Sequence, residues 1–222
     1  MKNNRRTKSC FPGVAARPKK FTSSARGFTL IELLVVIAIL AVLAVVVVLT
    51  LNPAGLLQEA RDSNRISDLG LLKNGLSLYI ADVLSPNLAS SSFGYSSCYL
   101  STPSGNGTTT VNCGMFTNTY VADVSTTQAL YKKNDSTGWI PVNFSQISFG
   151  TPLAMLPVDP VNNKSYFYGY AATTTGNNTY FEIDAFMESK KFMASGTNDI
   201  VTTDGGNNTS TFEVGNQPGF TL

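Results

Sequence analysis

The dominant pattern in the sequence is one long apolar run near the N-terminus. From Phe28 to Leu51 there are 24 residues, and only three of them are polar. The three are Thr29, Glu32 and Thr50. At a rise of ~1.5 Å per residue, a helix of this length is about 36 Å long and can cross a hydrocarbon core of ~30 Å. A secretory signal peptide has a shorter apolar segment, so we predict a transmembrane helix that stays on the mature protein.

Residues 52–84 have the pattern of a second, amphipathic helical segment. Asn52-Pro53 should bend or interrupt the helix, because proline has no amide proton and clashes with the preceding turn. One stripe at helical spacing is apolar and should pack on a sheet. It consists of Leu69, Leu72, Leu76, Tyr79, Ile80 and Val83. Residues 59–65 are polar around most of the helix, so we expect their charges to be free for contacts with neighbouring chains.

Residues 85–150 are rich in Ser, Thr, Asn and Gly. Within this region, residues 97–100 and 111–113 flank a turn-rich segment, and we expect a small loop or hairpin there. The apolar residues around Trp139 are interpreted as core, because no charged residues converge on them.

Residues 151–222 contain the clearest strand patterns. Residues 165–171 and 180–188 predict an antiparallel hairpin, and residues 212–214 a further short strand. Along residues 180–188, alternate positions should face a core, and the acidic positions Glu182, Asp184 and Glu188 should face water. These patterns predict an α+β fold, with one long N-terminal helix that is half transmembrane and half packed on a small antiparallel sheet of three or four strands.

Charge and cysteine usage divide the chain at residue 27. The first 27 residues hold eight of the 16 Lys and Arg residues and none of the 14 Asp and Glu residues. A basic flank before a membrane span predicts that the N-terminus stays in the cytoplasm and that the rest crosses the membrane. Cys98 and Cys113 lie in the exported part, where an oxidising compartment allows them to pair, and a structural disulfide is favoured over free thiols. The third cysteine, Cys10, lies in the basic segment.

Glu32 is anomalous because it lies four residues into the apolar run. A carboxylate in hydrocarbon costs at least ~2.5 kcal/mol, so Glu32 is a candidate functional residue. No Lys or Arg lies between Phe28 and Leu51, and its own helix therefore offers no partner. Cleavage after Gly27 would create a cationic amine on Phe28 that could pair with Glu32 of the same or a neighbouring helix. The other interpretation is an incidental polar residue near the end of an anchor.

Gly27-Phe28-Thr29-Leu30-Ile31-Glu32 resembles the class III leader and cleavage motif of type IV prepilins and type II secretion pseudopilins. This resemblance implies cleavage between Gly27 and Phe28 by a prepilin peptidase, N-methylation of Phe28, and a role for Glu32 in filament assembly. The implied segments are a removed leader (1–27), a transmembrane and filament-core helix (28–51), the second half of the helix (52–84), a loop region (85–150), and a sheet with a C-terminal loop (151–222).

The resemblance implies a structural subunit of a type IV pilus or pilus-like filament. Its partners would be further copies or related subunits, the prepilin peptidase, and an inner-membrane assembly platform with its ATPase motor. The precursor would lie in the bacterial inner membrane, and the mature chain in a surface pilus or a periplasmic filament. Two alternatives remain open, which are a pseudopilin of a periplasmic secretion piston and a membrane-anchored binding protein that does not polymerise.

Catalysis is not expected from this sequence. The chain has no histidine, which is the usual general base and transition-metal ligand, and no Gly-rich phosphate loop precedes a helix. The basic leader comes with no fold that would favour nucleic-acid binding. No cofactor is expected, with calcium as one possibility, because Asp199, Asp204 and Asn207 (with Asn208 beside them) offer oxygen donors in a loop and some pseudopilins bind calcium in such loops. An ordinary Asp-Gly turn is the other interpretation of this loop.

Overall fold

The computed structural model describes residues 27–89, 98–102, 121–122, 130–175 and 178–219. The chain divides into two units, Met1–Thr50 and Leu51–Leu222, and each is described by itself.

The first unit consists, in its described part, of most of helix α1 (Leu30–Leu51) and the residues before it. The apolar side chains are exposed on every side of this helix, as for Leu34 at 57% and Val45 at 59%. Residues Leu30–Val48 are long and apolar enough to cross a membrane, by length and composition. A helix without a polar face must be covered by lipid or by other helices, which agrees with the predicted span.

The helical segment is interrupted at Asn52, and helix α2 (Pro53–Asp82) follows. Asn52 has a left-handed backbone, with φ 42° and ψ 69°, and Pro53 occupies the start of α2, where a missing amide proton costs little. The Asn52 Oδ1 atom accepts a hydrogen bond from the Gly55 amide at 3.4 Å. The expected interruption at Asn52-Pro53 is therefore an end and a new start rather than a bend within one helix.

The second unit contains α2, a short 3-10 helix (Phe144–Gln146) and a five-stranded sheet in the order β2-β1-β3-β4-β5. The strands are β1 (Cys98–Leu100), β2 (Val121–Ala122), β3 (Tyr168–Thr175), β4 (Asn178–Ala185) and β5 (Phe212–Gly215). Strands β1, β3, β4 and β5 form antiparallel pairs, which confirms the α+β fold. Strand β2 pairs in parallel with β1 at the edge, which was not predicted.

The sheet register confirms the hairpin expected from residues 165–171 and 180–188. Strands β3 and β4 form the predicted hairpin, with Tyr170 opposite Ile183. Residues 97–100 are the first arm of the other expected feature, a small loop or hairpin with residues 111–113. The described residues of this arm, Cys98–Leu100, pair with β3 on one side and with β2 on the other. The second arm lies outside the described residues.

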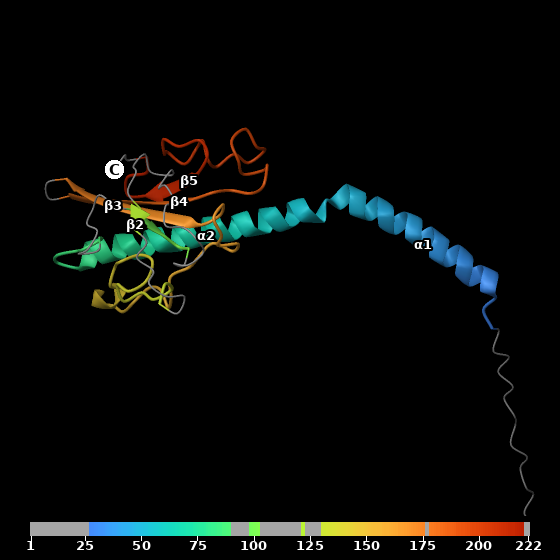
Figure 1. Ribbon diagram of the computed structural model, residues 1–222, viewed down its shortest axis with the longest axis horizontal. Coiled ribbons are helices and arrows are strands. Elements are labelled where there is room, and N and C mark those ends of the chain that lie inside the picture. The colour runs from blue at the N-terminus through green and yellow to red at the C-terminus, as the bar shows by residue number, and fades with distance from the viewer. Residues whose placement is uncertain (1–26, 90–97, 103–120, 123–129, 176–177, 220–222) are drawn as a thin grey trace, which may run out of the picture. The chain divides into compact units, whose positions relative to one another are not determined.

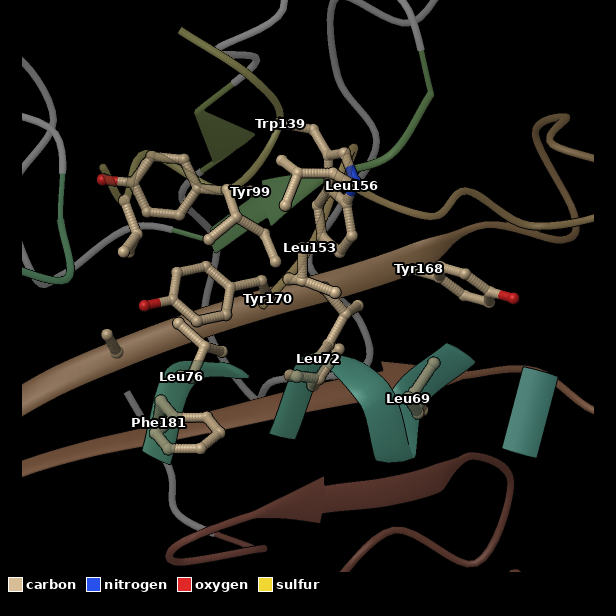
Figure 2. Close-up of a cluster of buried hydrophobic side chains, with 14 of the residues drawn as sticks. Leu69, Leu72, Leu76, Tyr99, Trp139, Leu153, Leu156, Tyr168, Tyr170 and Phe181 are labelled. Atoms are coloured by element: carbon tan, nitrogen blue, oxygen red, sulfur yellow. The ribbon is translucent and has the colours of Figure 1, made fainter. Parts of the chain in front are cut away.

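One face of the sheet and the apolar stripe of α2 contribute to the hydrophobic core (Figure 2). Leu69, Leu72, Leu76 and Tyr79 of the stripe are at most 1% exposed, as predicted. The interpretation of Trp139 as core is also confirmed, since it is fully buried and its Nε1 donates a hydrogen bond to the Pro157 carbonyl at 2.9 Å. Full burial of each large apolar side chain contributes ~1.5–3 kcal/mol to this packing.

The other face of the sheet is not wet, contrary to the sequence-based expectation. Glu182 and Asp184 of β4 are 1% and 0% exposed, and Glu213 of β5 is 1% exposed. The C-terminal loops, red in Figure 1, lie on the side of the sheet away from α2, and the Asn208 amide donates a hydrogen bond to Glu213 Oε2. The alternation of apolar and acidic residues in β4 therefore identified which side chains share a face of the sheet. A later part of the chain covers the acidic face.

Candidate functional site

The Gly27–Phe28 junction, the predicted cleavage position, is exposed. The Phe28 side chain is 86% exposed, and both residues precede the first turn of α1. Within the described part of the chain, a Cβ placed on Gly27 would have no heavy atom within 4 Å. The described residues therefore leave the junction uncovered, with open space beside Gly27.

Glu32 has a hydrogen-bond partner in the residue directly before its helix, which corrects the sequence-based expectation. Its Oε2 accepts hydrogen bonds from the Thr29 amide at 3.0 Å and from the Thr29 hydroxyl at 2.9 Å. In return, the Glu32 amide donates to Thr29 Oγ1 at 3.2 Å. This reciprocal pair is a capping box, in which the side chains satisfy two amides that the first helical turn leaves unpaired. The Thr-x-x-Glu spacing was the sequence signature that could have identified it.

The capping box survives the predicted cleavage. The Thr29 amide belongs to the Phe28–Thr29 peptide bond, and a cut between Gly27 and Phe28 leaves that bond intact. The box holds the Glu32 carboxylate in the first turn of α1, where the helix dipole also favours a negative charge. After cleavage, the carboxylate and the new amine would belong to the same end of the helix.

The charges in the first part of α2 are not free, contrary to expectation. Arg65 is fully buried, and its Nε lies 2.6 Å from Asp159 Oδ2. It also pairs with Asp62 at 2.7 Å and with Glu188 at 2.6 Å. Burial alone would lower the pKa of Arg65, but the hydrogen bonds to Asp159, Glu188 and Asp62 raise it, so the guanidinium stays charged.

Two further ion pairs extend this buried charge cluster to the protein surface. Arg61 donates through Nε to Glu188 at 2.9 Å, and this hydrogen bonding lowers the pKa of Glu188 despite its burial. The ammonium group of Lys191 lies 2.9 Å from Glu59 Oε2. The first turns of α2 are thereby attached to the segment that follows β4. Sequence patterns could not show this, because the partners are more than 90 residues away.

The predicted calcium ligands stabilise turns in the C-terminal loop. Asp199 accepts hydrogen bonds from the amides of Ser195, Val201 and Thr202. The carboxylate of Asp204 accepts from the amides of Gly206 and Glu213, and Asn207 donates through Nδ2 to the Gly219 carbonyl. In the described part of the chain, the acidic groups close enough to share a metal ion are Glu182, Asp184 and Glu213. Neither Asp199 nor Asp204 belongs to that group.

Cys98 is fully buried in β1 and is disulfide-bonded. Cys113 lies outside the described residues, so the pairing of Cys98 with Cys113 stays a prediction.

The family model described as the prokaryotic N-terminal methylation motif matches residues 22–48. The match includes Gly27, Phe28 and Glu32 and most of α1. The chain therefore carries the class III signal of type IV pilins and pseudopilins. This motif supports a type IV pilin-like or pseudopilin family, with a membrane-anchored precursor. No curated protein and no solved structure matches the chain.

Proposed function

We propose that the protein is a structural subunit of a type IV pilus or pilus-like filament. One observation carries this proposal. Helix α1 is apolar and exposed on all sides, and its single acidic residue, Glu32, lies in the first turn beside the exposed Gly27–Phe28 junction. A helix of this kind can be covered first by lipid and later by copies of itself.

In this proposal, the leader holds the precursor in the bacterial inner membrane until a prepilin peptidase cuts after Gly27 and Phe28 is methylated. An inner-membrane platform and its ATPase motor then add the subunit to a growing filament. The α1 helices form the filament core, and burial of their apolar side chains provides most of the cohesion. Head-to-tail contacts that do not close into a ring generate such a filament. The proposed role is structural and includes no catalysis.

Glu32 sets the position of each incoming subunit in this scheme. The methylated Phe28 amine stays cationic and pairs with the Glu32 carboxylate of a neighbouring helix. In an apolar filament core the attraction is strong, and an unpaired carboxylate would be costly. The capping box supports this role, because Thr29 holds the carboxylate at the end of the helix where the amine is formed.

Electron microscopy of sheared cell surfaces, with an antibody against residues 85–222, tests the proposal. Long labelled filaments in the wild type, absent from a strain with Glu32→Ala, are the expected result. Label confined to the envelope would favour a pseudopilin of a periplasmic secretion piston. A chain that keeps its leader and stays in the membrane would overturn the filament proposal in favour of a membrane-anchored binding protein.

A further inference from the structure

Three carboxylates gather on the face of the sheet away from α2. Asp184 of β4 lies directly opposite Glu213 of β5 in the strand register, and Glu182 is on the same face of β4, two residues earlier. One oxygen of each of the three carboxylates lies within 4.8 Å of the others. Like charges directly opposite each other destabilise a pair of strands, so this arrangement needs a compensating feature.

Backbone amides and basic side chains of the described residues do not neutralise Asp184. Asp184 is completely buried, and neither of its carboxylate oxygens has a hydrogen-bond partner among the residues that the structure describes. In the same described part of the chain, Glu213 Oε1 is also buried without a partner, whereas Oε2 accepts a hydrogen bond from the Asn208 amide at 2.9 Å. Among the described residues, no Lys or Arg forms an ion pair with Asp184 or Glu213. A buried carboxylate without a partner is costly unless it binds a proton or a cation.

A fourth carboxylate adds to the negative charge. Asp204 accepts a hydrogen bond from the Glu213 amide at 2.8 Å, which places it beside the group. Burial raises the pKa of Asp184 well above its usual value, and the charges of Glu182, Glu213 and Asp204 raise it further. Burial likewise raises the pKa of Glu213. These shifts reflect the cost of keeping the group ionised when no cation is bound.

The surroundings of the group combine small residues with a closely packed loop. On β3, the residues opposite Asp184 and Glu182 are Gly169 and Ala171, whose side chains are the smallest available. Above β5, the backbone of Gly206 packs so closely that a Cβ there would collide with the Glu213 carboxylate. The strands therefore fix the positions of the three carboxylates, and the loop after Asp204 covers the Glu213 carboxylate.

We infer that Glu182, Asp184 and Glu213 bind a hard divalent cation of the size of calcium. All the available ligand atoms are oxygens, which calcium prefers, and the group contains no sulfur or imidazole ligand. Two oxygens that bind one calcium ion at ~2.4 Å can be up to ~4.8 Å apart, which agrees with the observed grouping. The ion would join β4 to β5. This site is built from strand residues and differs from the loop set of Asp199, Asp204 and Asn207.

Calcium-dependent thermal unfolding of the mature full-length chain in detergent tests the inference. The wild type should unfold at a higher temperature in calcium than in EDTA, by roughly 5–10 °C when free calcium is ~100-fold above its Kd. Bound calcium, measured by mass spectrometry of the metal after gel filtration, should approach one ion per chain. No shift together with no bound calcium would overturn the inference.

Variants distinguish a metal site from a set of carboxylates whose charge is neutralised by bound protons. Asp184→Asn should abolish the calcium-dependent shift and, in EDTA, should unfold at a higher temperature than the wild type because the repulsion is reduced. Glu213→Gln gives an independent test if the first variant does not fold. Asp199→Asn is the matched control and should keep the shift, since Asp199 is outside the group. A shift that persists in Asp184→Asn, or a stabilised Asp184→Asn beside a wild type that ignores calcium, would contradict the site.

Discussion

Arg65 Nε lies 2.6 Å from Asp159 Oδ2, and both side chains are fully buried although 94 residues separate them in the sequence. The pair joins α2 to the segment before β3. Asp159 also accepts a hydrogen bond from the Val161 amide at 2.8 Å, so the same carboxylate fixes the helix and shapes a turn. Residues that look like a charged helix surface in the sequence therefore attach the helix to the globular domain.

Arg65→Leu should destabilise the domain by ~3–5 kcal/mol, because Asp62 and Asp159 would stay buried without their cation. Chemical unfolding of the mature full-length chain in detergent measures this loss. Lys133→Ala is a suitable control, because its ion pair with Asp135 is exposed and should contribute no more than ~1 kcal/mol. A loss below ~1 kcal/mol in Arg65→Leu would contradict a stabilising role for the buried cluster.

The stability of the domain should decrease in acid through Glu188. Hydrogen bonds from Arg61 hold the pKa of Glu188 below its ordinary value of 4.5 in the folded protein. A carboxylate with a lowered folded-state pKa contributes stability above its unfolded-state pKa, and that contribution is lost as the pH falls through the folded-state value. Unfolding measured between neutral pH and about pH 3 should show this loss. The decrease in unfolding free energy per pH unit should be smaller in Glu188→Gln than in the wild type. An equal decrease in both proteins would exclude Glu188 as the source of the pH dependence.

Two substitutions can distinguish the effect of the Glu32 charge from the effect of the capping box with Thr29. Glu32→Gln keeps the capping box, since Gln can accept the same hydrogen bonds, but removes the charge. Thr29→Ala keeps the charge and removes the hydroxyl, at a cost of ~1 kcal/mol to the helix start. We expect Glu32→Gln to insert in the membrane but to assemble few filaments, and Thr29→Ala to assemble more. Filament yield relative to membrane-inserted chain is the measurement, and the reverse order would show that capping matters more than charge.

Gly27→Leu should block removal of the leader, because a bulky side chain would stand at the exposed junction. Mass spectrometry of the membrane-bound chain should then show the precursor, whereas the wild type should show a chain that begins at methylated Phe28. Gly70→Leu is the control, since Gly70 in α2 also has open space where a Cβ would be. Detection of the unchanged mature mass in Gly27→Leu would contradict the requirement for a small residue at the cleaved bond.

Local sequence patterns were sufficient for much of this protein. The apolar run, the helix interruption at Asn52-Pro53, the buried stripe of α2 and the β3–β4 hairpin all depend on neighbouring residues. The periodicity and backbone preferences that determine these features can be identified within short segments of the sequence. The methylation motif at residues 22–48 is local in the same way, and it contains Gly27, Phe28 and Glu32. The Thr29-x-x-Glu32 spacing is local as well, and it indicates a neutral hydrogen-bond partner for Glu32 rather than a charged one.

Only the tertiary structure decided what covers each face. The alternation in β4 places Glu182 and Asp184 on one side, but it cannot show that a loop more than 20 residues later closes over them beside Glu213. Arg65 looks like a solvated helix charge until Asp159 and Glu188 are brought next to it. Periodicity records which side chains share a face, whereas burial and ion pairing depend on chain segments that meet only in the folded protein.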